Sequence, residues 1–104
     1  MLTPDLSGRT ALVTGSAKGV GRELLAAIAA CGADVAVHYN TSDDAAAEVA
    51  EHARETGVSA TAVQGDVTDP DDVDALFSAV EAELGTVDVL VNNVGAFAPV
   101  HWEE

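Results

Sequence analysis

The sequence predicts an α/β protein with a doubly wound parallel sheet, because short apolar runs alternate along it with segments of helical spacing. The order of these segments is β-α-β-α-β-α-β. Strands joined by crossovers of helix length lie parallel, and such connections are right-handed. Glycines between each helical segment and the next apolar run support the same order. With 104 residues, the chain is expected to form one domain at most.

Four apolar runs rich in β-branched residues are the predicted strands. Strands that are buried on both faces have continuous apolar sequences rather than an alternation of apolar and polar residues. The runs lie at residues 11–13, 35–37, 61–63 and 89–91.

Three segments between these runs carry apolar residues at helical spacing and are the predicted helices. The first is expected to bury Val20, Leu24, Ala27, Ile28 and Cys31, the second Ala46, Val49, Ala50 and Ala53, and the third Val73, Leu76, Phe77, Val80 and Leu84. Small residues dominate the second set, so that helix is expected to pack close to the sheet.

The predicted helix ends carry suitable capping residues. Asp69 is expected to cap the third helix, with Pro70 at its first position. Either Thr41 or Ser42 is expected to cap the second helix. The expected C-terminal caps are Gly32, Gly57 and Gly85.

The charge distribution excludes some partners. The formal net charge is −14, and it arises from residues 43–104, which contain fifteen carboxylates and only one basic residue, Arg54. Such a surface repels nucleic acid and anionic lipid, so neither is expected as a partner. Two explanations stay open: adaptation to a high-salt interior, where screening weakens the repulsion, and a codon bias toward Ala, Val and Asp.

Other features narrow the class of protein. The longest apolar stretch, residues 24–31, is far shorter than the roughly 20 residues of a membrane-spanning helix. No basic region followed by an apolar run opens the sequence, so we expect a cytoplasmic protein without a secretory leader. Cys31 is the single cysteine, which excludes an internal disulfide and a cysteine-based zinc site. No metal site is expected, because the aspartates around residues 69–74 are interpreted as helix-capping acids.

Two histidines and the cysteine receive structural interpretations. His38 lies inside the second predicted strand and is expected to be packed or hydrogen-bonded rather than catalytic. Cys31 is interpreted as a core residue. His52 is expected to face solvent on the second helix.

A glycine-rich turn follows the first predicted strand and leads directly into the first helix. Gly15 permits a sharp turn, Gly19 permits close approach of a pyrophosphate, and Gly21 permits close packing of helix and strand. The helix N-terminus presents free N–H groups, and Lys18 and Arg22 add positive charge. This arrangement predicts dinucleotide binding. The expected contacts of the turn are Gly15, Ser16, Lys18, Gly19, Val20 and Gly21.

Three motifs in this order resemble those of the short-chain dehydrogenase/reductase family. The first is Thr-Gly-x-x-x-Gly-x-Gly at residues 14–21, and the second is Asp66-Val67 after the third strand, where the family contacts adenine. The third, residues 92–95, is similar to the family's Asn-Asn-Ala-Gly motif, except that Val94 replaces the alanine. The resemblance implies a partial NAD(P)-binding Rossmann domain over residues 1–104, with strand order 3-2-1-4.

The resemblance also implies which residues meet the cofactor. Family members that prefer NAD place an acid after the second strand, whereas this chain has Tyr39, Asn40 and Thr41 there. Members that use NADP often carry a basic residue before the middle glycine, here Lys18. We therefore expect NADP(H) rather than NAD, unless Asp43 and Asp44 fold back against the 2′-phosphate. The residues expected on the ribose side are Asn92, Val94 and Gly95.

The family's catalytic group is a Tyr-x-x-x-Lys pair preceded by a serine. The single tyrosine and single lysine of this chain, Tyr39 and Lys18, lack that spacing, so no catalytic residue is assigned. The resemblance implies the N-terminal part of an oxidoreductase, inactive alone, that moves hydride between a nicotinamide and a carbonyl or alcohol. The complete enzyme is expected to be a homo-oligomer. Two alternatives stay open: a stand-alone NADP(H)-binding module, and a remnant that docks through the edge of the fourth strand.

Overall fold

The structure, a computed structural model, describes residues 5–93, which form four strands and three helices. In chain order they are β1 (Thr10–Val13), α1 (Gly19–Ala30), β2 (Asp34–Tyr39), α2 (Asp43–Glu55), β3 (Ala60–Gln64), α3 (Pro70–Leu84) and β4 (Val89–Val91). This order confirms the predicted alternation of strands and helices.

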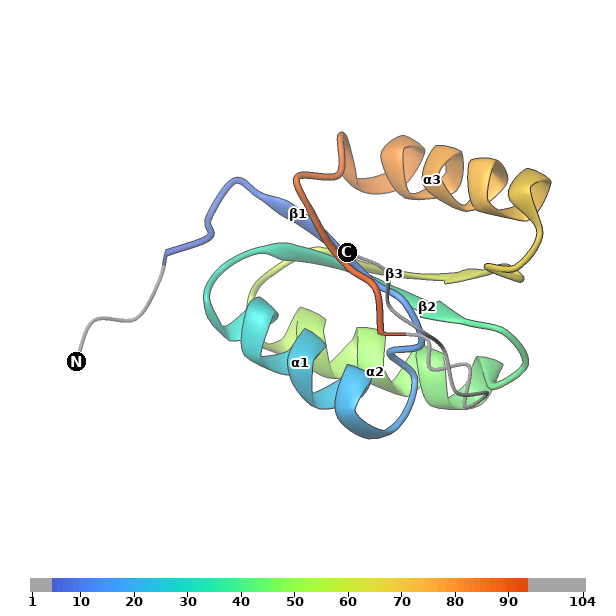
Figure 1. Cartoon of the computed structure of the whole chain (residues 1–104). Coiled ribbons are helices and arrows are strands. Elements are labelled where there is room, and N and C mark those ends of the chain that lie inside the picture. The colour runs from blue at the N-terminus through green and yellow to red at the C-terminus, as the bar shows by residue number, and fades with distance from the viewer. Residues whose placement is uncertain (1–4, 94–104) are drawn as a thin grey trace, which may run out of the picture.

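The sheet is parallel, and its strand order is β3-β2-β1-β4, as the resemblance implied. Val13 at the end of β1 pairs with Val37 of β2 and with Val91 of β4. Helices α1 and α2 cover one face of the sheet and α3 covers the other, so the sheet is doubly wound (Figure 1). Because all strands run the same way, their carboxyl ends meet at one edge.

The two faces of the sheet carry separate hydrophobic cores. Ala11, Val13, Val35 and Val37 point toward α1 and α2, and each is fully buried. Leu12 and Ala36, which alternate with them, point toward α3 and are also fully buried. The two central strands are therefore buried on both faces, which explains why their sequences are continuously apolar.

The predicted buried face of α1 is wrong. Gly21, Leu25 and Ala29 are the buried residues of this helix, whereas Val20 is 69% exposed and Leu24 is 39% exposed. Gly21 sets the rotation of the helix, because it packs against Gly15 and Asn93, and residues four and eight positions later follow it on the same buried face. The other predicted members miss the core: Ala27 is exposed, Ile28 is half-buried, and Cys31 is a half-buried residue after the helix end.

The predicted faces of the other two helices are confirmed. All four predicted residues of α2 are buried, namely Ala46, Val49, Ala50 and Ala53. In α3, Leu76 and Val80 are buried, and Val73, Phe77 and Leu84 are half-buried.

The helix ends largely follow the prediction. The Asp69 carboxylate accepts a hydrogen bond from the Asp71 amide at 2.9 Å, and Pro70 opens α3. Ser42 is the residue that caps α2, but its side chain makes no capping bond. The three predicted glycines, Gly32, Gly57 and Gly85, each follow a helix.

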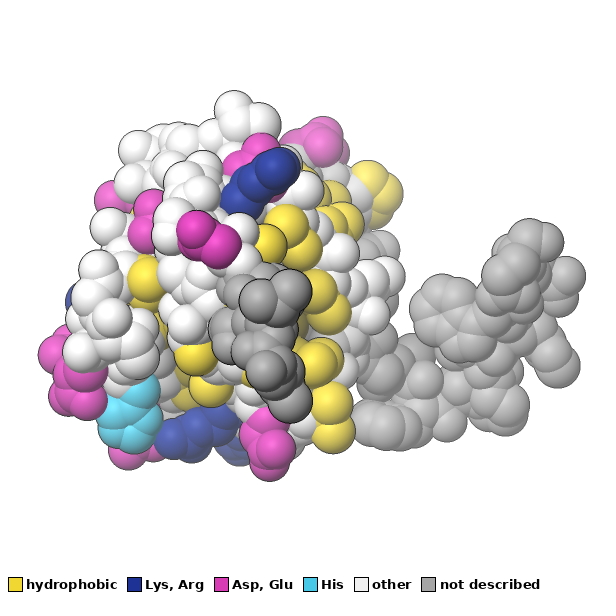
Figure 2. Space-filling view, turned by 90° about the vertical axis from the view of Figure 1, so that its left-hand side faces the viewer, with side chains coloured by type: hydrophobic (Ala, Val, Ile, Leu, Met, Phe, Trp, Pro, Cys, Tyr) yellow, Lys and Arg dark blue, Asp and Glu magenta, His cyan; other side chains and the backbone are white. Residues whose placement is uncertain are grey.

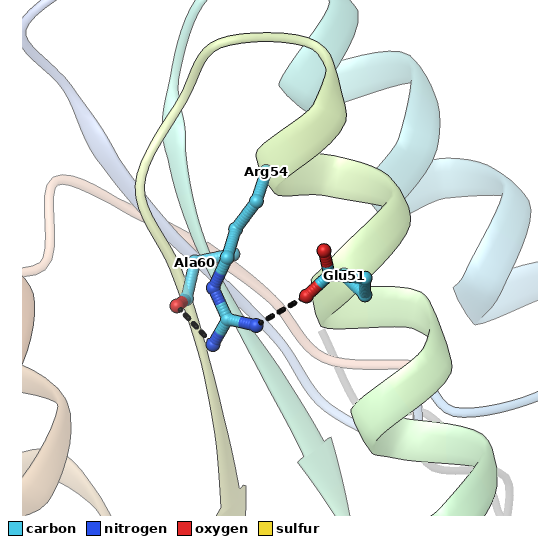
Figure 3. Close-up of polar contacts among 3 residues, drawn as sticks. All are labelled: Glu51, Arg54 and Ala60. Carbon is cyan, nitrogen blue, oxygen red and sulfur yellow. Dashed lines mark hydrogen bonds and ion pairs between the residues drawn. The ribbon is translucent and has the colours of Figure 1, made fainter.

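A side chain of α2 fastens the end of this helix to the beginning of β3. Arg54 Nη2 donates to the carbonyl oxygen of Ala60 at 3.0 Å, and Nη1 donates to Glu51 Oε1 at 3.2 Å (Figure 3). The guanidinium therefore satisfies a carbonyl at the start of β3, at the end of the sheet opposite to the carboxyl edge.

The surface reflects the charge of the sequence. On the face seen in Figure 2, acidic side chains are scattered rather than gathered in one patch, and a band of hydrophobic side chains lies among them. Within residues 5–93, the structure contains no helix with the length and apolar character needed to cross a membrane.

Candidate functional site

A cleft of about 680 Å³ lies at the carboxyl edge of the sheet. It is lined by the turn after β1, the end of β2, the loop after β3 and the residues that follow β4. These residues are Gly15, Lys18, Gly19, Val20, His38, Asn40, Gly65, Asp66, Val67, Thr68 and Asn93. In doubly wound sheets, ligands bind at this edge, where the strand order reverses, and here the reversal falls between β1 and β4.

The turn between β1 and α1 leaves open space above its backbone. Gly15 and Gly19 adopt φ angles of +63° and +62°, which side-chain-bearing residues rarely adopt. A Cβ added to Gly19 would meet no protein atom within 4 Å, and Gly19 is one of the residues that line the cleft. A ligand can therefore approach the backbone of Gly19 more closely than it could approach any other residue type.

The N-terminus of α1 opens at the same point. Lys18, which precedes the helix, makes no side-chain capping bond, and the first turn holds no acidic residue. The first amide groups of a helix lack intrahelical partners, and the helix dipole places positive charge there. These features fit the pyrophosphate of a dinucleotide, which is an anion.

Gly21 permits close packing behind the turn. A Cβ added to Gly21 would overlap the carbonyl oxygen of Gly15 and the side-chain nitrogen of Asn93. Asn93 Nδ2 itself donates to that Gly15 carbonyl at 3.3 Å. Helix α1, the turn and the end of β4 thus meet at one position without a side chain.

Thr14 links the turn to β4. Its amide donates to the Val91 carbonyl at 3.0 Å, and its hydroxyl accepts a hydrogen bond from the Asn93 amide at 2.8 Å. The hydroxyl lies 3.1 Å from Asn92 Oδ1, to which it donates. Of this Asn-Asn pair, Asn93 lines the cleft, whereas Asn92 is not among the lining residues and its side chain is bonded to Thr14.

Ser16 belongs to the interior rather than to the cleft. Its side chain is fully buried, and its hydroxyl donates to the Val13 carbonyl at 2.7 Å. The same hydroxyl accepts from the His38 amide at 3.1 Å, and the Ser16 amide donates to the His38 carbonyl at 3.0 Å. Ser16 therefore holds the turn against β2, and its hydroxyl faces away from the space above the turn.

A smaller pocket of about 190 Å³ adjoins the cleft beside the end of β2. It brings together Lys18 and the three predicted residues Tyr39, Asn40 and Thr41. Hydroxyl, amide and ammonium groups can all bond a phosphate, and among these four residues there is no carboxylate to repel one. The two acidic residues that could have opposed a phosphate, Asp43 and Asp44, begin α2 and are not among the lining residues.

The loop after β3 presents Asp66 and Val67 to the cleft. The Thr68 hydroxyl donates to Asp66 Oδ1 at 2.6 Å, and the Thr68 amide donates to the same oxygen at 2.9 Å. These bonds, that of the hydroxyl first, hold the pKa of the Asp66 carboxyl below its ordinary value. The Asp66 amide in turn donates to Asp72 Oδ2 at 2.9 Å, which fixes the loop to α3.

His38 also lines the cleft, although it was not among the site residues predicted from the sequence. Its side chain is 2% exposed, and the Gly15 amide donates to its Nδ1 at 2.8 Å. Its Nε2 lies 2.7 Å from the carbonyl oxygen of Gly65. The expectation of a packed, hydrogen-bonded histidine is confirmed, but its position between the two walls of the cleft was missed. Gly65 and Thr68 were missed as well.

Two predicted residues, Val94 and Gly95, lie outside the described residues. The remaining ones gather at the carboxyl edge or directly behind it, although they come from four separate parts of the chain. His52, expected to face solvent, is exposed on α2, away from this edge.

A parallel sheet of this order, with a glycine-rich turn that opens into a cleft at its reversal point, has the Rossmann-type architecture. The sequence profile described as short chain dehydrogenase matches residues 9–104. The chain belongs to this family of oxidoreductases.

Three similar proteins illustrate the relationship. A 3beta-hydroxysteroid dehydrogenase 1 of Eggerthella lenta is 42% identical over 91 residues, which are 88% of this chain and 35% of that protein. The landomycin C-6 ketoreductase LanV, solved with bound NADP and rabelomycin, superposes with a TM-score of 0.80 at 43% identity, covering 89% of this chain and 40% of LanV. A blue fluorescent protein from a metagenomic library, solved in complex with NADPH, gives a TM-score of 0.83 at 36% identity, and the match covers 88% of this chain and 38% of that protein. The chain thus spans about a third of the length of the curated relative.

Proposed function

We propose that this chain forms the NADP(H)-binding part of an oxidoreductase that transfers hydride between a nicotinamide and a carbonyl group or secondary alcohol. The observation that carries the proposal is the uncapped N-terminus of α1, which opens into the cleft at Gly19, a residue whose missing side chain leaves room for a ligand. Bound NADP or NADPH in similar structures supports the same conclusion.

The amide groups at the beginning of α1 would bind the pyrophosphate. Gly19 would allow the phosphate oxygens to reach them, and the positive end of the helix dipole would stabilise the charge. The turn at residues 15–21 contains Lys18 and no carboxylate. In a chain of net charge −14, this segment therefore repels an anionic ligand least.

The 2′-phosphate of NADP(H) would lie in the smaller pocket, near Lys18. Tyr39, Asn40 and Thr41 would replace the carboxylate with which NAD-binding proteins hold the free ribose hydroxyl. The adenine would lie against Asp66 and Val67 on the opposite wall of the cleft.

The bound nicotinamide would supply or accept the hydride, and the part played by this chain is to bind and orient the cofactor. We assign no proton-transfer group to its residues, because the single tyrosine and single lysine lack the family's Tyr-x-x-x-Lys spacing. The substrate would be a small carbonyl compound or alcohol.

Calorimetric titration with NADPH and with NADH tests the binding part of the proposal, on the protein as its gene encodes it. We expect NADPH to bind more tightly. Lys18→Gln should weaken NADPH binding by about 10- to 100-fold, the usual value of a hydrogen bond to a charged group, and should leave NADH binding nearly unchanged. Arg9→Gln is the matched control, because it removes an equal charge from an exposed residue before β1, at the far edge of the sheet. Tighter binding of NADH, or equal losses for both cofactors, would contradict the proposal.

The reaction is tested on the protein as its gene encodes it, by NADPH consumption with a panel of small aldehydes and ketones. Turnover with at least one of them is the expected result. Tight NADPH binding without turnover across the panel would reject the oxidoreductase and leave a module that binds the cofactor without chemistry.

A further inference from the structure

We propose that His38 is a positioning residue that joins the two walls of the cofactor cleft and fixes the distance between them. This inference rests on the proposed binding of NADP(H). The imidazole is bonded on one side to Gly15, in the turn before α1, and on the other side to Gly65, at the start of the loop after β3. Both bonds are short, at 2.8 and 2.7 Å, and the side chain is almost fully buried.

The two partners select one state of the ring. The Gly15 amide can only donate, so Nδ1 is an unprotonated acceptor. The Gly65 carbonyl can only accept, so Nε2 carries the hydrogen and donates it. A neutral imidazole in the Nε2–H tautomer satisfies both partners. The opposite tautomer, with the hydrogen on Nδ1, would place two donors against each other at Gly15 and two acceptors against each other at Gly65.

The backbone of His38 is held just as firmly. Its amide donates to the Ser16 hydroxyl and its carbonyl accepts from the Ser16 amide, so the residue is tied to the turn at both of its backbone groups. On the other side, the Gly65 amide donates to the carbonyl of Tyr39 at 3.1 Å. The ring is therefore a rigid link between two backbone segments, each of which is held by its own hydrogen bonds.

The two hydrogen bonds of the imidazole hold segments that would contact different parts of the proposed ligand. Gly15 belongs to the turn that would hold the pyrophosphate. Gly65 directly precedes Asp66 and Val67, which would hold the adenine. Among the described residues that line the cleft, the two charged ones, Lys18 and Asp66, are exposed. The walls are thus joined inside the protein by His38, and the two bonds can be removed one at a time.

Two amide side chains separate the bonds. In His38→Asn, the side-chain oxygen takes the place of Nδ1 and keeps the bond to Gly15, but the side chain is too short for Gly65. In His38→Gln, the side-chain nitrogen takes the place of Nε2 and keeps the bond to Gly65, but no acceptor faces Gly15. The affinities of NADPH and of adenosine 2′-monophosphate, which lacks the pyrophosphate, are measured for both variants and the wild type.

We expect the ratio of NADPH affinity to adenosine 2′-monophosphate affinity to fall about tenfold in His38→Gln, because only the pyrophosphate wall is released. In His38→Asn, both affinities should fall together and the ratio should stay within about twofold of the wild type. If the role of His38 were purely structural, both variants would have a lower unfolding temperature and the affinity ratio would change equally in both. If the wild type binds NADPH and the affinity ratio is the same in all three proteins, this inference alone is overturned. Wild-type protein that binds no NADPH would overturn the proposed function, and this inference with it.

A measurement on the wild type keeps the inference testable where a variant does not fold. Nitrogen NMR of the His38 imidazole should show a protonated Nε2 and an unprotonated Nδ1, with NADPH shifting the signals of both nitrogens. The opposite tautomer, or a ring whose signals ignore the cofactor, would overturn the inference.

Discussion

Substituting Gly19 separates the two requirements that the turn places on this position, its backbone conformation and its missing side chain. Gly19→Ala introduces a Cβ that meets no protein atom within 4 Å, at a position that lines the cleft. Gly57→Ala is the matched control. Gly57 also has a positive φ, of +99°, and an added Cβ there also meets nothing within 4 Å, but it lies after α2, away from the cleft.

Both substitutions carry a similar conformational cost. A left-handed backbone costs a residue with a side chain about 1–2 kcal/mol, and the less flexible unfolded chain offsets about 0.4–1 kcal/mol of it. Each variant should therefore lose about 1 kcal/mol of unfolding free energy. The φ of Gly57 lies further from the left-handed minimum near +57°, so the control should lose at least as much stability as Gly19→Ala.

The two variants should differ in cofactor binding. The extra methyl group of Gly19→Ala occupies space that the pyrophosphate needs, and crowding by one such group costs about 1–3 kcal/mol, or about 5- to 150-fold in affinity. Urea unfolding without ligand gives the stabilities, and calorimetric titration with NADPH gives the affinities. Gly57→Ala should bind NADPH as the wild type does. Equal affinities in the two variants would refute the reasoning, because strain alone would then explain the effect of Gly19→Ala.

Two further predictions concern the loop after β3 and the helix that follows it. Asp69→Ala should lower the unfolding free energy by about 1 kcal/mol through loss of the α3 cap, whereas Asp74→Ala, exposed on the same helix, should change it by less than about 0.5 kcal/mol; urea unfolding of both variants checks this. Because the folded-state pKa of Asp66 is lowered, the ionised carboxyl stabilises the fold above its unfolded-state pKa, and this contribution is lost as the pH falls through the folded-state pKa. Carbon NMR titration should show that Thr68→Val raises the Asp66 pKa, and an unchanged value would contradict the assignment of the Thr68 hydroxyl as its main cause.

Local sequence patterns were sufficient for most of the fold. The strands, α2 and α3 could be predicted because continuous apolar runs, capping residues such as Asp69 and one apolar stripe per helix all indicate the same elements. The buried face of α1 could not be predicted in this way. Its apolar residues surround most of the helix, and the face that packs on the sheet is set by Gly21, which has no hydrophobicity to reveal it.

In the candidate site, too, the residues that are close in sequence could be predicted, and those brought together only by the fold could not. The glycine turn is contiguous in sequence, so its residues could be recognised from their spacing. His38, by contrast, lies 23 residues from Gly15 and 27 from Gly65, and only the pairing of β2 with its neighbours brings the three together. Ser16 shows the converse case: it belongs to the turn in sequence, but its hydroxyl is directed to β2.

The most direct test of NADP(H) binding is a crystal structure of the gene-encoded protein with NADPH. The pyrophosphate should lie within hydrogen-bond distance of the first amide groups of α1, over Gly19, with the 2′-phosphate beside Lys18 and Asn40. A cofactor bound elsewhere, or one whose ribose and adenine occupy the turn while its phosphates face solvent, would contradict the assignment of this cleft.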